Sequence, residues 1–394
     1  RPFLEKNIHQ VLHHSKYILG PEVSELENRL AEYTGSKHVV SCSSGTDALL
    51  MVLMACNVGP GDAVFTSPFT FIATAEVIAL LGATPVFVDI DPQTYNIAPN
   101  QLEKAVQAVE QNDPSLHPLP QPVQPDQPVQ PHNKPLQPDQ PVQPQDKPVQ
   151  PKAIIPVDLY GLPCDFEAIN SLADKHGLYV IEDAAQSLGA EYKGGMAGNL
   201  SHIGCTSFFP AKPLGGYGDG GAIFTNDDSL AEELRSIRVH GKGSHKYDNA
   251  RIGVNGRLDT IQAAILLAKL DVFAQEIDRR QQLAKQYTEW LSDHPNLTTP
   301  FVPEGVSSAW AQYSLLVRDS KDREKLQTLL KEHNIPSVIY YPKPLHQQSA
   351  FSYLGYREGD MPASEDCSQR IFSLPIHPYL TDEEQEYIVS VIRS

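Results

Sequence analysis

The sequence has few cysteines, few basic residues and no long hydrophobic run. Its five cysteines lack CxxC spacing, which favours reduced thiols and a cytoplasmic protein. No apolar run approaches the ~20 residues of a membrane span, so no transmembrane segment is expected. Lysine and arginine number 31 against 48 acidic residues, and the formal net charge of −17 argues against a broad nucleic-acid surface. Histidines and carboxylates do not recur at metal-ligand spacing, so no metal site is predicted.

The 394 residues, 41% of them hydrophobic, suffice for two domains with a sizeable core. The composition changes abruptly between Pro114 and Pro151, where a proline recurs every few residues among glutamines. Such a segment forms neither helix nor sheet, so we expect polyproline II structure or disorder. It is interpreted as an insertion, either a repeat-expanded surface loop or a docking ligand for a proline-binding module. The chain opens at Arg1 without methionine or a signal-peptide pattern, so a few native residues are expected to precede it.

Short β-rich runs alternate with helical patterns before and after this segment. The runs are HVVSCSS, AVFTSP, TPVFVDI, AIIPVDL, YVIEDAA, CTSFFP and AIFTN. This alternation predicts an α/β domain with a largely parallel sheet, in which ligands bind at the carboxyl ends of the strands. We expect this large domain to span residues 1–262. A long helix and a smaller α/β domain are expected over residues 263–394.

Four strand ends carry groups that could bind one ligand. In SSGTDALL, Gly45 and Thr46 open a helix whose free amides favour a phosphate, although a plain capped helix explains the same letters. Ser207 ends a later strand and could add a hydroxyl to this phosphate site. Phe71 follows AVFTSP and could cover a flat ring, or it could belong to the core.

The two remaining strand ends offer an acid and an amine. Asp183 and Gln186 follow the buried run YVIEDAA, where a carboxylate is either a turn former or the partner of a protonated heteroaromatic nitrogen. Lys212 stands between prolines before a glycine-rich loop, and it is either a solvated loop lysine or a desolvated nucleophile. Taken together, these groups are what pyridoxal 5′-phosphate needs from its protein.

The strings SGTDAL, IEDAAQS, SFFPAKPLGGYGDGG and GVNGRLDTIQAAIL together resemble the DegT/DnrJ/EryC1/StrS sugar aminotransferases, which are fold type I pyridoxal-phosphate enzymes. The resemblance runs from about Tyr17 to the C-terminus, interrupted by the proline-rich segment. It implies a mostly parallel seven-stranded sheet flanked by helices. It also implies a homodimer that moves an amino group, usually from glutamate, to a nucleotide-linked keto sugar.

The resemblance assigns roles around the cofactor ring. It implies that Lys212 forms the covalent link to the cofactor, that Asp183 pairs with the ring nitrogen, that Gln186 neighbours the ring hydroxyl and that Phe71 stacks on the ring.

The resemblance also assigns the phosphate group. It implies that Gly45, Thr46 and Ser207 hold the phosphate, and that Asn255 reaches it from the neighbouring subunit.

Within the family, the chain most resembles enzymes that aminate C3 of UDP-2-acetamido-2-deoxy-3-oxo-glucuronate for bacterial surface polysaccharide. Arg257 could bind the uronate or diphosphate, or form a salt bridge instead, and Lys343 is a weaker candidate. Tyr340 stands before Tyr341 where related members commonly have histidine, so both tyrosines are candidate substrate residues.

Three alternatives stay open. A dTDP-3-keto-6-deoxyhexose is the alternative substrate. A deoxysugar dehydratase of the same fold has histidine in place of the lysine, so Lys212 argues against that activity. A non-catalytic regulatory or assembly protein is the third reading.

Overall fold

The computed structural model describes residues 2–120, 149–245 and 247–394. Most of the predicted proline-rich insertion therefore lies outside the described residues. The part that is described is placed against the domain. His117 is buried, and strand β4 already begins at Gln150.

A seven-stranded sheet forms the centre of the large domain, with the strand order β1-β9-β8-β5-β4-β2-β3. Strand β9 runs antiparallel to both of its neighbours, and the remaining neighbouring pairs are parallel. The predicted α/β fold with a mostly parallel seven-stranded sheet is confirmed. The strands are β1 (His38–Cys42), β2 (Asp62–Thr66), β3 (Thr84–Phe87), β4 (Gln150–Ile155), β5 (Tyr179–Asp183), β8 (Ile203–Ser207) and β9 (Gly221–Thr225).

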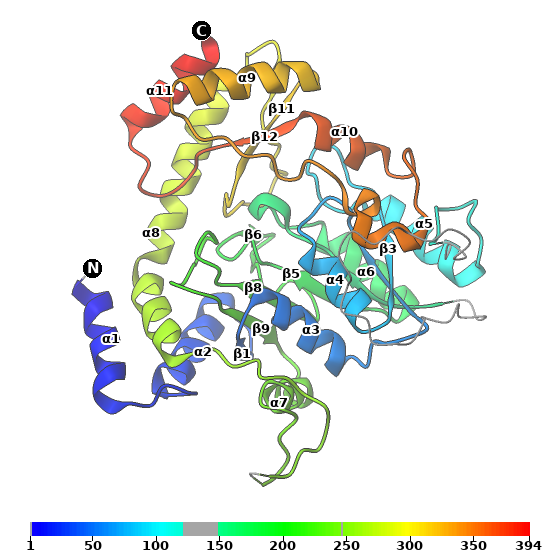
Figure 1. Ribbon diagram of the computed structural model, residues 1–394, viewed down its shortest axis with the longest axis vertical. Helices are drawn as coiled ribbons and strands as arrows, with labels where there is room; N and C mark the ends of the chain where they lie inside the picture. Colours follow the sequence, from blue (N-terminus) through cyan, green and yellow to red (C-terminus); the bar gives the residue numbers. More distant parts are fainter. Residues whose placement is uncertain (1, 121–148, 246) are drawn as a thin grey trace.

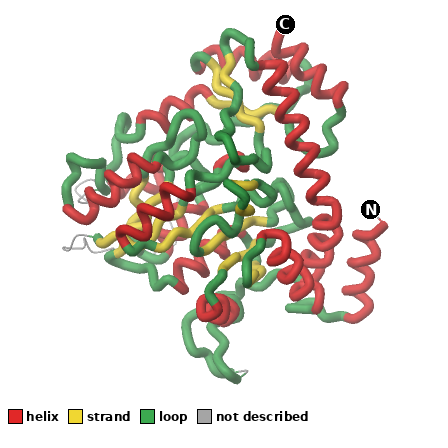
Figure 2. The backbone as a smooth tube through the Cα atoms, turned by 180° about the vertical axis from the view of Figure 1, so that it is seen from behind, coloured by secondary structure: helices red, strands yellow, loops and turns green. Residues whose placement is uncertain are grey.

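Helices cover both faces of this sheet, as Figure 2 shows. Side-chain alternation along β5 explains this, because Ile181 packs with one apolar core and Val180 with the core of the opposite face. The helices of the large domain are α1 (Pro2–His14), α2 (Pro21–Thr34), α3 (Gly45–Ala55), α4 (Ala73–Leu80), α5 (Pro99–Gln111), α6 (Phe166–His176) and α7 (Asp228–Ile237), with the 3₁₀ turn η1 (Leu159–Gly161) and the hairpin β6 (Glu191–Tyr192) and β7 (Gly195–Met196).

Helix α8 (Thr260–Leu291) runs along the molecule and joins the two domains (Figure 1). Its first half packs through Leu266 and Phe273 against the large domain, and its second half packs through Leu283 and Tyr287 in the core of the small domain. The predicted boundary at residue 262 thus falls at the start of a helix that contacts both domains.

The small domain is built on a three-stranded antiparallel sheet. Its elements are β10 (Leu297–Thr298), β11 (Tyr313–Val317), β12 (Ile371–Leu374), α9 (Ser320–Glu332), α10 (Pro362–Arg370), α11 (Asp382–Arg393), η2 (Leu345–Gln347) and η3 (Ser349–Leu354). Within the described residues, no helix is both long and apolar enough to cross a membrane.

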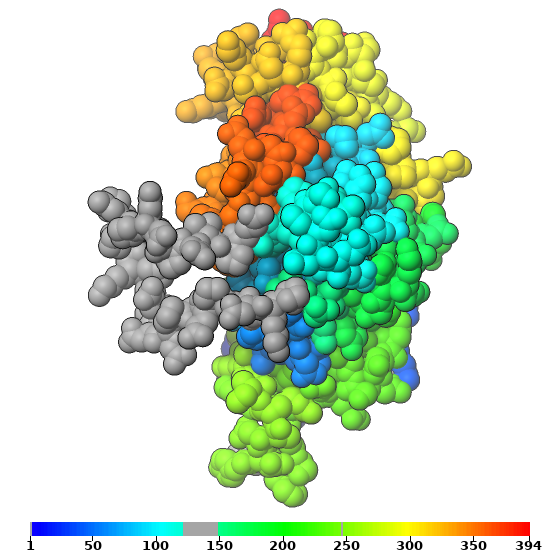
Figure 3. All heavy atoms as spheres, turned by 90° about the vertical axis from the view of Figure 1, so that its right-hand side faces the viewer, coloured from blue at the N-terminus to red at the C-terminus, as the bar shows by residue number. Residues whose placement is uncertain are grey.

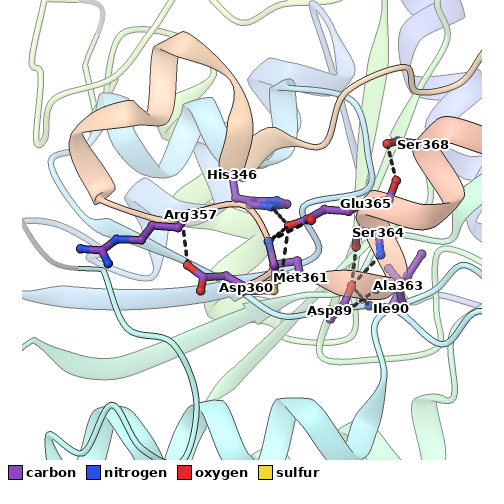
Figure 4. A network of polar contacts seen from close by, with 11 residues as sticks. Asp89, Ile90, His346, Arg357, Asp360, Met361, Ala363, Ser364, Glu365 and Ser368 are labelled. Carbon is purple, nitrogen blue, oxygen red and sulfur yellow. Dashed lines mark hydrogen bonds and ion pairs between the residues drawn. The ribbon is translucent and has the colours of Figure 1, made fainter.

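Polar contacts dock the small domain on the edge of the large sheet (Figure 4). The Asp89 carboxylate, just beyond β3, accepts hydrogen bonds from the backbone amides of Ala363 and Ser364 at 2.8 and 2.9 Å. It thereby caps the first turn of α10, where free amides favour a negative charge. His346 of η2 contacts Glu365 of α10 at 2.9 Å, so the segment that leads into η2 is tied to the same helix.

The loop between α7 and α8 projects from the body of the large domain (Figure 3). Its base is a bridge between Val239 and Asn255. Ile252 on this loop is 85% exposed.

Candidate active site

The start of α3 forms a tightly packed cradle beside the end of β8. The Ser44 hydroxyl accepts the Asp47 amide at 3.0 Å and caps the helix. A Cβ added to Gly45 would lie 2.7 Å from the Cβ of Ser207, so only glycine lets these two segments approach this closely. The first-turn amides of Gly45 and Thr46 therefore lie at a helix start that packs against the end of β8, where Ser207 stands. Such a helix start suits a phosphate dianion.

Asp183 ends strand β5 as a buried acid. Its carboxylate accepts hydrogen bonds from the Thr74 hydroxyl at 2.8 Å and from the Ala185 amide at 3.2 Å. Burial raises the pKa of Asp183, and the two hydrogen bonds and the charge of Lys212 oppose that rise. These contacts hold the carboxylate in one orientation.

Lys212 lies on the loop between β8 and β9, close enough to Asp183 for their charges to interact. Burial lowers the pKa of Lys212, and the Asp183 carboxylate partly offsets this effect. The loop folds back on itself, since the Lys212 amide donates to the Phe209 carbonyl at 2.8 Å. A lowered pKa favours the neutral amine, which is the form that acts as a nucleophile.

Gln186 and Tyr341 complete the surroundings of Asp183. The side-chain oxygen of Gln186 accepts the Tyr160 amide at 2.9 Å, which leaves the Gln186 NH₂ group as a donor. Burial and the Asp183 charge raise the pKa of Tyr341, and contact with the Gln186 side chain opposes the rise. Tyr341 of the small domain therefore lies near the Asp183 carboxylate and the Gln186 side chain.

Phe71 precedes α4 and is 54% exposed. It is therefore not a core residue, so the alternative interpretation of the sequence is wrong. Phe69, two residues earlier, is fully buried and meets the Tyr341 ring edge-on at 6.5 Å between centroids.

The segment before α8 carries the remaining predicted residues of the large domain. Asn255 is exposed at the base of the projecting loop. Arg257 is half-buried, and its Nε has no hydrogen-bond partner among the described residues. Between them, the Gly256 carbonyl accepts the amide of Ser43, just before the α3 cradle, at 3.0 Å. A guanidinium with an unpartnered buried nitrogen suits an anionic ligand.

Lys343 lies apart from the cofactor residues. It is exposed and lines a surface cavity of about 460 Å³ with residues of the small domain. The other lining residues are Pro342, Gln347, Glu358, Glu365, Ser368 and Gln369. Among residues 2–120, 149–245 and 247–394, no cluster of histidine, cysteine and carboxylate side chains is arranged to hold a metal ion.

The model of the DegT/DnrJ/EryC1/StrS aminotransferase family matches residues 2–111 and 136–393. The chain belongs to this family. The gap between the two matched stretches, residues 112–135, overlaps the region Pro114–Pro151 that is interpreted from the sequence as an insertion.

The similarity of this aminotransferase to known proteins extends over nearly its whole length. It is 46% identical to the UDP-2-acetamido-2-deoxy-3-oxo-D-glucuronate aminotransferase of Pseudomonas aeruginosa, over 96% of this chain and 91% of that protein. It is 42% identical to a pleiotropic regulatory protein of Geobacillus stearothermophilus, over 100% of this chain and 94% of that protein. A crystal structure of a DegT DnrJ EryC1 StrS aminotransferase from Brucella abortus is 47% identical and superposes with a TM-score of 0.88, covering 100% of this chain and 95% of that one.

Two residues of the aminotransferase site were missed from the sequence. Thr74 holds Asp183, and Tyr160 holds Gln186 through its backbone amide. The strand-end rule does not mark Thr74, because it lies inside the first turn of α4 and well beyond the end of β2. Nothing in the local pattern marks Tyr160, whose contacts depend on the packing of the two domains.

Proposed function

We propose that this aminotransferase transfers an amino group from glutamate to C3 of UDP-2-acetamido-2-deoxy-3-oxo-glucuronate, with pyridoxal 5′-phosphate as cofactor, in the bacterial cytoplasm. The observation that supports this most is the pairing of Lys212 with Asp183. An amine of lowered pKa faces a fixed buried carboxylate at the carboxyl ends of β5 and β8. That pair supplies both the nucleophile and the counter-ion that this chemistry needs.

The described residues fit pyridoxal phosphate. Gly45 packs against Ser207 too closely to admit a Cβ, and we propose that the free amides of this helix start hold the phosphate. We propose that Asp183 faces the ring nitrogen as the acid and that the Gln186 side chain donates to the ring hydroxyl. The exposed ring of Phe71 can cover the face of the cofactor.

When bound, pyridoxal phosphate supplies a ring that accepts the electron pair left when the carbon bearing the amine loses its proton. Asp183, held by Thr74, keeps the proton on the ring nitrogen, because the carboxylate stabilises the protonated form. The Lys212 amine would take the proton from that carbon and deliver it to C4′ of the cofactor, so that the lysine ends the step as a free amine again. Burial of both groups strengthens their electrostatic interaction.

The uronate assignment rests on Arg257 and on the similarity to the Pseudomonas aeruginosa enzyme. The Arg257 guanidinium, whose Nε has no partner among the described residues, suits a carboxylate at C6 of the sugar, whereas a dTDP-3-keto-6-deoxyhexose has a methyl group there. Tyr340 and Tyr341 are proposed to line the sugar site from the small domain.

A substrate panel tests the proposal. The purified protein is given glutamate and either UDP-2-acetamido-2-deoxy-3-oxo-glucuronate or the dTDP-3-keto-6-deoxyhexose, and products are identified by mass spectrometry. We expect amination of the uronate, and a KM for it that rises at least about tenfold in Arg257→Met. Amination of the deoxyhexose alone would refute the uronate assignment. Lys212→Ala should abolish both reactions.

A homodimer with shared active sites is proposed from the surface around the start of α8. Ile18, Tyr217 and Ile252 are more than half exposed there. Ile18 bridges Asp259, and the Tyr217 amide bonds the side chain of Gln262, so these apolar residues surround one segment. The same segment carries Asn255, which we propose contacts the phosphate of the partner's cofactor.

A regulatory role is the second candidate, because the Geobacillus stearothermophilus relative is named a pleiotropic regulatory protein. The intact pair of Lys212 and Asp183 favours catalysis. The purified protein reconstituted with pyridoxal phosphate should be yellow, and glutamate should bleach its long-wavelength absorption. Absorption that no amino donor alters would support the regulatory reading.

A further inference from the structure

Tyr160 occupies an unusual backbone position between the two domains. It is the central residue of η1, with φ +61° and ψ 5°, and only 6% of its surface is exposed. A left-handed conformation is uncommon for a residue with a large side chain, so packing and hydrogen bonds must hold it. The Tyr95 ring packs edge-on against it at 5.7 Å between centroids.

The backbone of Tyr160 contacts the cofactor side of the site. Its amide donates to the side-chain oxygen of Gln186 at 2.9 Å. The next residue is equally constrained, because a Cβ on Gly161 would lie 2.8 Å from the Trp310 nitrogen and 3.0 Å from the Gln186 carbonyl oxygen. The turn is therefore fixed against Gln186 on one side and against the segment between β10 and β11 on the other.

The side chain of Tyr160 contacts the small-domain segment that is proposed to line the sugar site. Its hydroxyl donates to the backbone carbonyl of Tyr340. Five residues on, the Leu345 amide donates to the Pro68 carbonyl at 2.7 Å. The arch between these two anchors contains Tyr341, whose hydroxyl lies near Asp183. We call residues 340–345 the tyrosine arch.

We propose that Tyr160 is a positioning residue that fixes the tyrosine arch relative to Gln186, and so sets the space available to the keto sugar. This inference rests on the proposed nucleotide-sugar aminotransferase function. A single residue thus links the cofactor ring to the sugar: its amide holds the group beside the ring hydroxyl, and its hydroxyl holds the small-domain segment that covers the substrate. Movement of the arch changes sugar binding and leaves the Lys212–Asp183 pair intact.

The hydroxyl remains a donor under working conditions. Burial raises the pKa of Tyr160 well above its ordinary value, and the nearby Tyr341 and Tyr95 hydroxyls raise it further. The bond to the Tyr340 carbonyl is therefore present throughout the neutral pH range.

Tyr160→Phe tests the proposal, with Tyr95→Phe as the matched control. Tyr95 is also buried and left-handed, at φ +63°, and lies in the same apolar cluster, but its hydroxyl bonds neither Gln186 nor the tyrosine arch among the described residues. We expect Tyr160→Phe to raise the KM of the sugar about five- to tenfold, the effect of one lost hydrogen bond, with kcat changed less than about twofold. The absorption spectrum and the rate of the half-reaction with glutamate should match those of the wild type.

Two further measurements separate positioning from general destabilisation and from a wrong substrate. Hydrogen exchange of the protein without cofactor should be faster in peptides covering the tyrosine arch in Tyr160→Phe, and unchanged in Tyr95→Phe. Equal exchange and equal KM in wild type and Tyr160→Phe would overturn the proposal. If the wild type does not aminate the uronate, the substrate assignment fails. Hydrogen exchange in the tyrosine arch still decides whether Tyr160 holds the arch in place. Equal effects in Tyr160→Phe and Tyr95→Phe would show that Tyr160 acts only through packing, and would also overturn the proposal.

Discussion

Asp183 and Lys212 are two charged side chains whose properties depend on each other. Burial pushes both towards their neutral forms, and each opposes that effect in the other. Their chemical types and their positions after strands could be read from the sequence. The hydroxyl of Thr74 could not, because its contact with Asp183 forms only when α4 is placed beside β5. At this scale, the sequence predicts the reactive groups better than the groups that orient them.

Replacing Asp183 should disable chemistry without unfolding the protein. Asp183→Asn keeps the shape and can still bond Thr74, but it loses a charge pair worth about 4 kcal/mol, so we expect the half-reaction with glutamate to slow about 10³-fold. Because the pKa of Asp183 is raised, its charge is lost as the pH falls, and the wild-type rate should decline on the acid side. Stopped-flow absorbance across pH measures both effects. Thr74→Val is the control, with a much smaller loss. A rate for Asp183→Asn within tenfold of wild type would contradict the assigned role.

The order of helices and strands was readable because apolar periodicity switches between the two kinds of element. Strand β3 shows what was not readable. It lies at the edge of the sheet, and its Phe87 carbonyl accepts the His117 Nε2–H at 2.8 Å while its amide donates to the Tyr356 hydroxyl at 3.1 Å. The sequence placed His117 in an insertion with little to bury, whereas it satisfies an edge carbonyl that would otherwise be unpaired.

His117 should make stability depend on pH. Burial lowers its pKa from the ordinary 6.5, and the charge of Lys104 adds to this effect, whereas Asp89 and Asp360 oppose it. The contribution of His117 to the free energy of unfolding is therefore complete above pH 6.5 and declines as the pH falls below that value. His117→Gln retains a donor but does not titrate, so we expect a loss of no more than about 1 kcal/mol at neutral pH and a flatter decline under acid conditions.

Urea unfolding midpoints between about pH 5 and pH 8 measure this difference. His9→Gln, at an exposed position on α1, is the control and should follow the wild type. Parallel curves for wild type and His117→Gln would rule out a contribution from His117.

At the scale of the whole molecule, one surface is covered where the two domains meet and another stays exposed. The small domain docks through Asp89 and α10, and the apolar residues around the start of α8 remain exposed. The sequence pattern alone cannot show which apolar residues are exposed, because exposure depends on the neighbours of each residue in space. Asn255 is exposed, as the proposed contact with a second copy of the chain requires.

Mixing two inactive variants tests the shared active site. Lys212→Ala and Asn255→Ala disable different parts of one site, so a mixed dimer regains one complete site from the intact residue of each chain. After the two variants are unfolded together and refolded, half of the dimers are mixed, and we expect about one quarter of wild-type activity. Each variant refolded alone is the control. No recovery, with mixed dimers shown by mass spectrometry, would mean that each site belongs to one chain.

The amino-acid sequence by itself determined the α/β class, the strand ends that carry Asp183 and Lys212, and the similarity to aminotransferases. These depend on local periodicity and on residue type, which are written in order along the chain. Only the tertiary structure decided that Gly45 meets Ser207, that Tyr160 links Gln186 to Tyr340, and that α8 belongs to both domains. Such contacts join segments far apart in the chain, and their existence depends on distances that are set only when the elements pack.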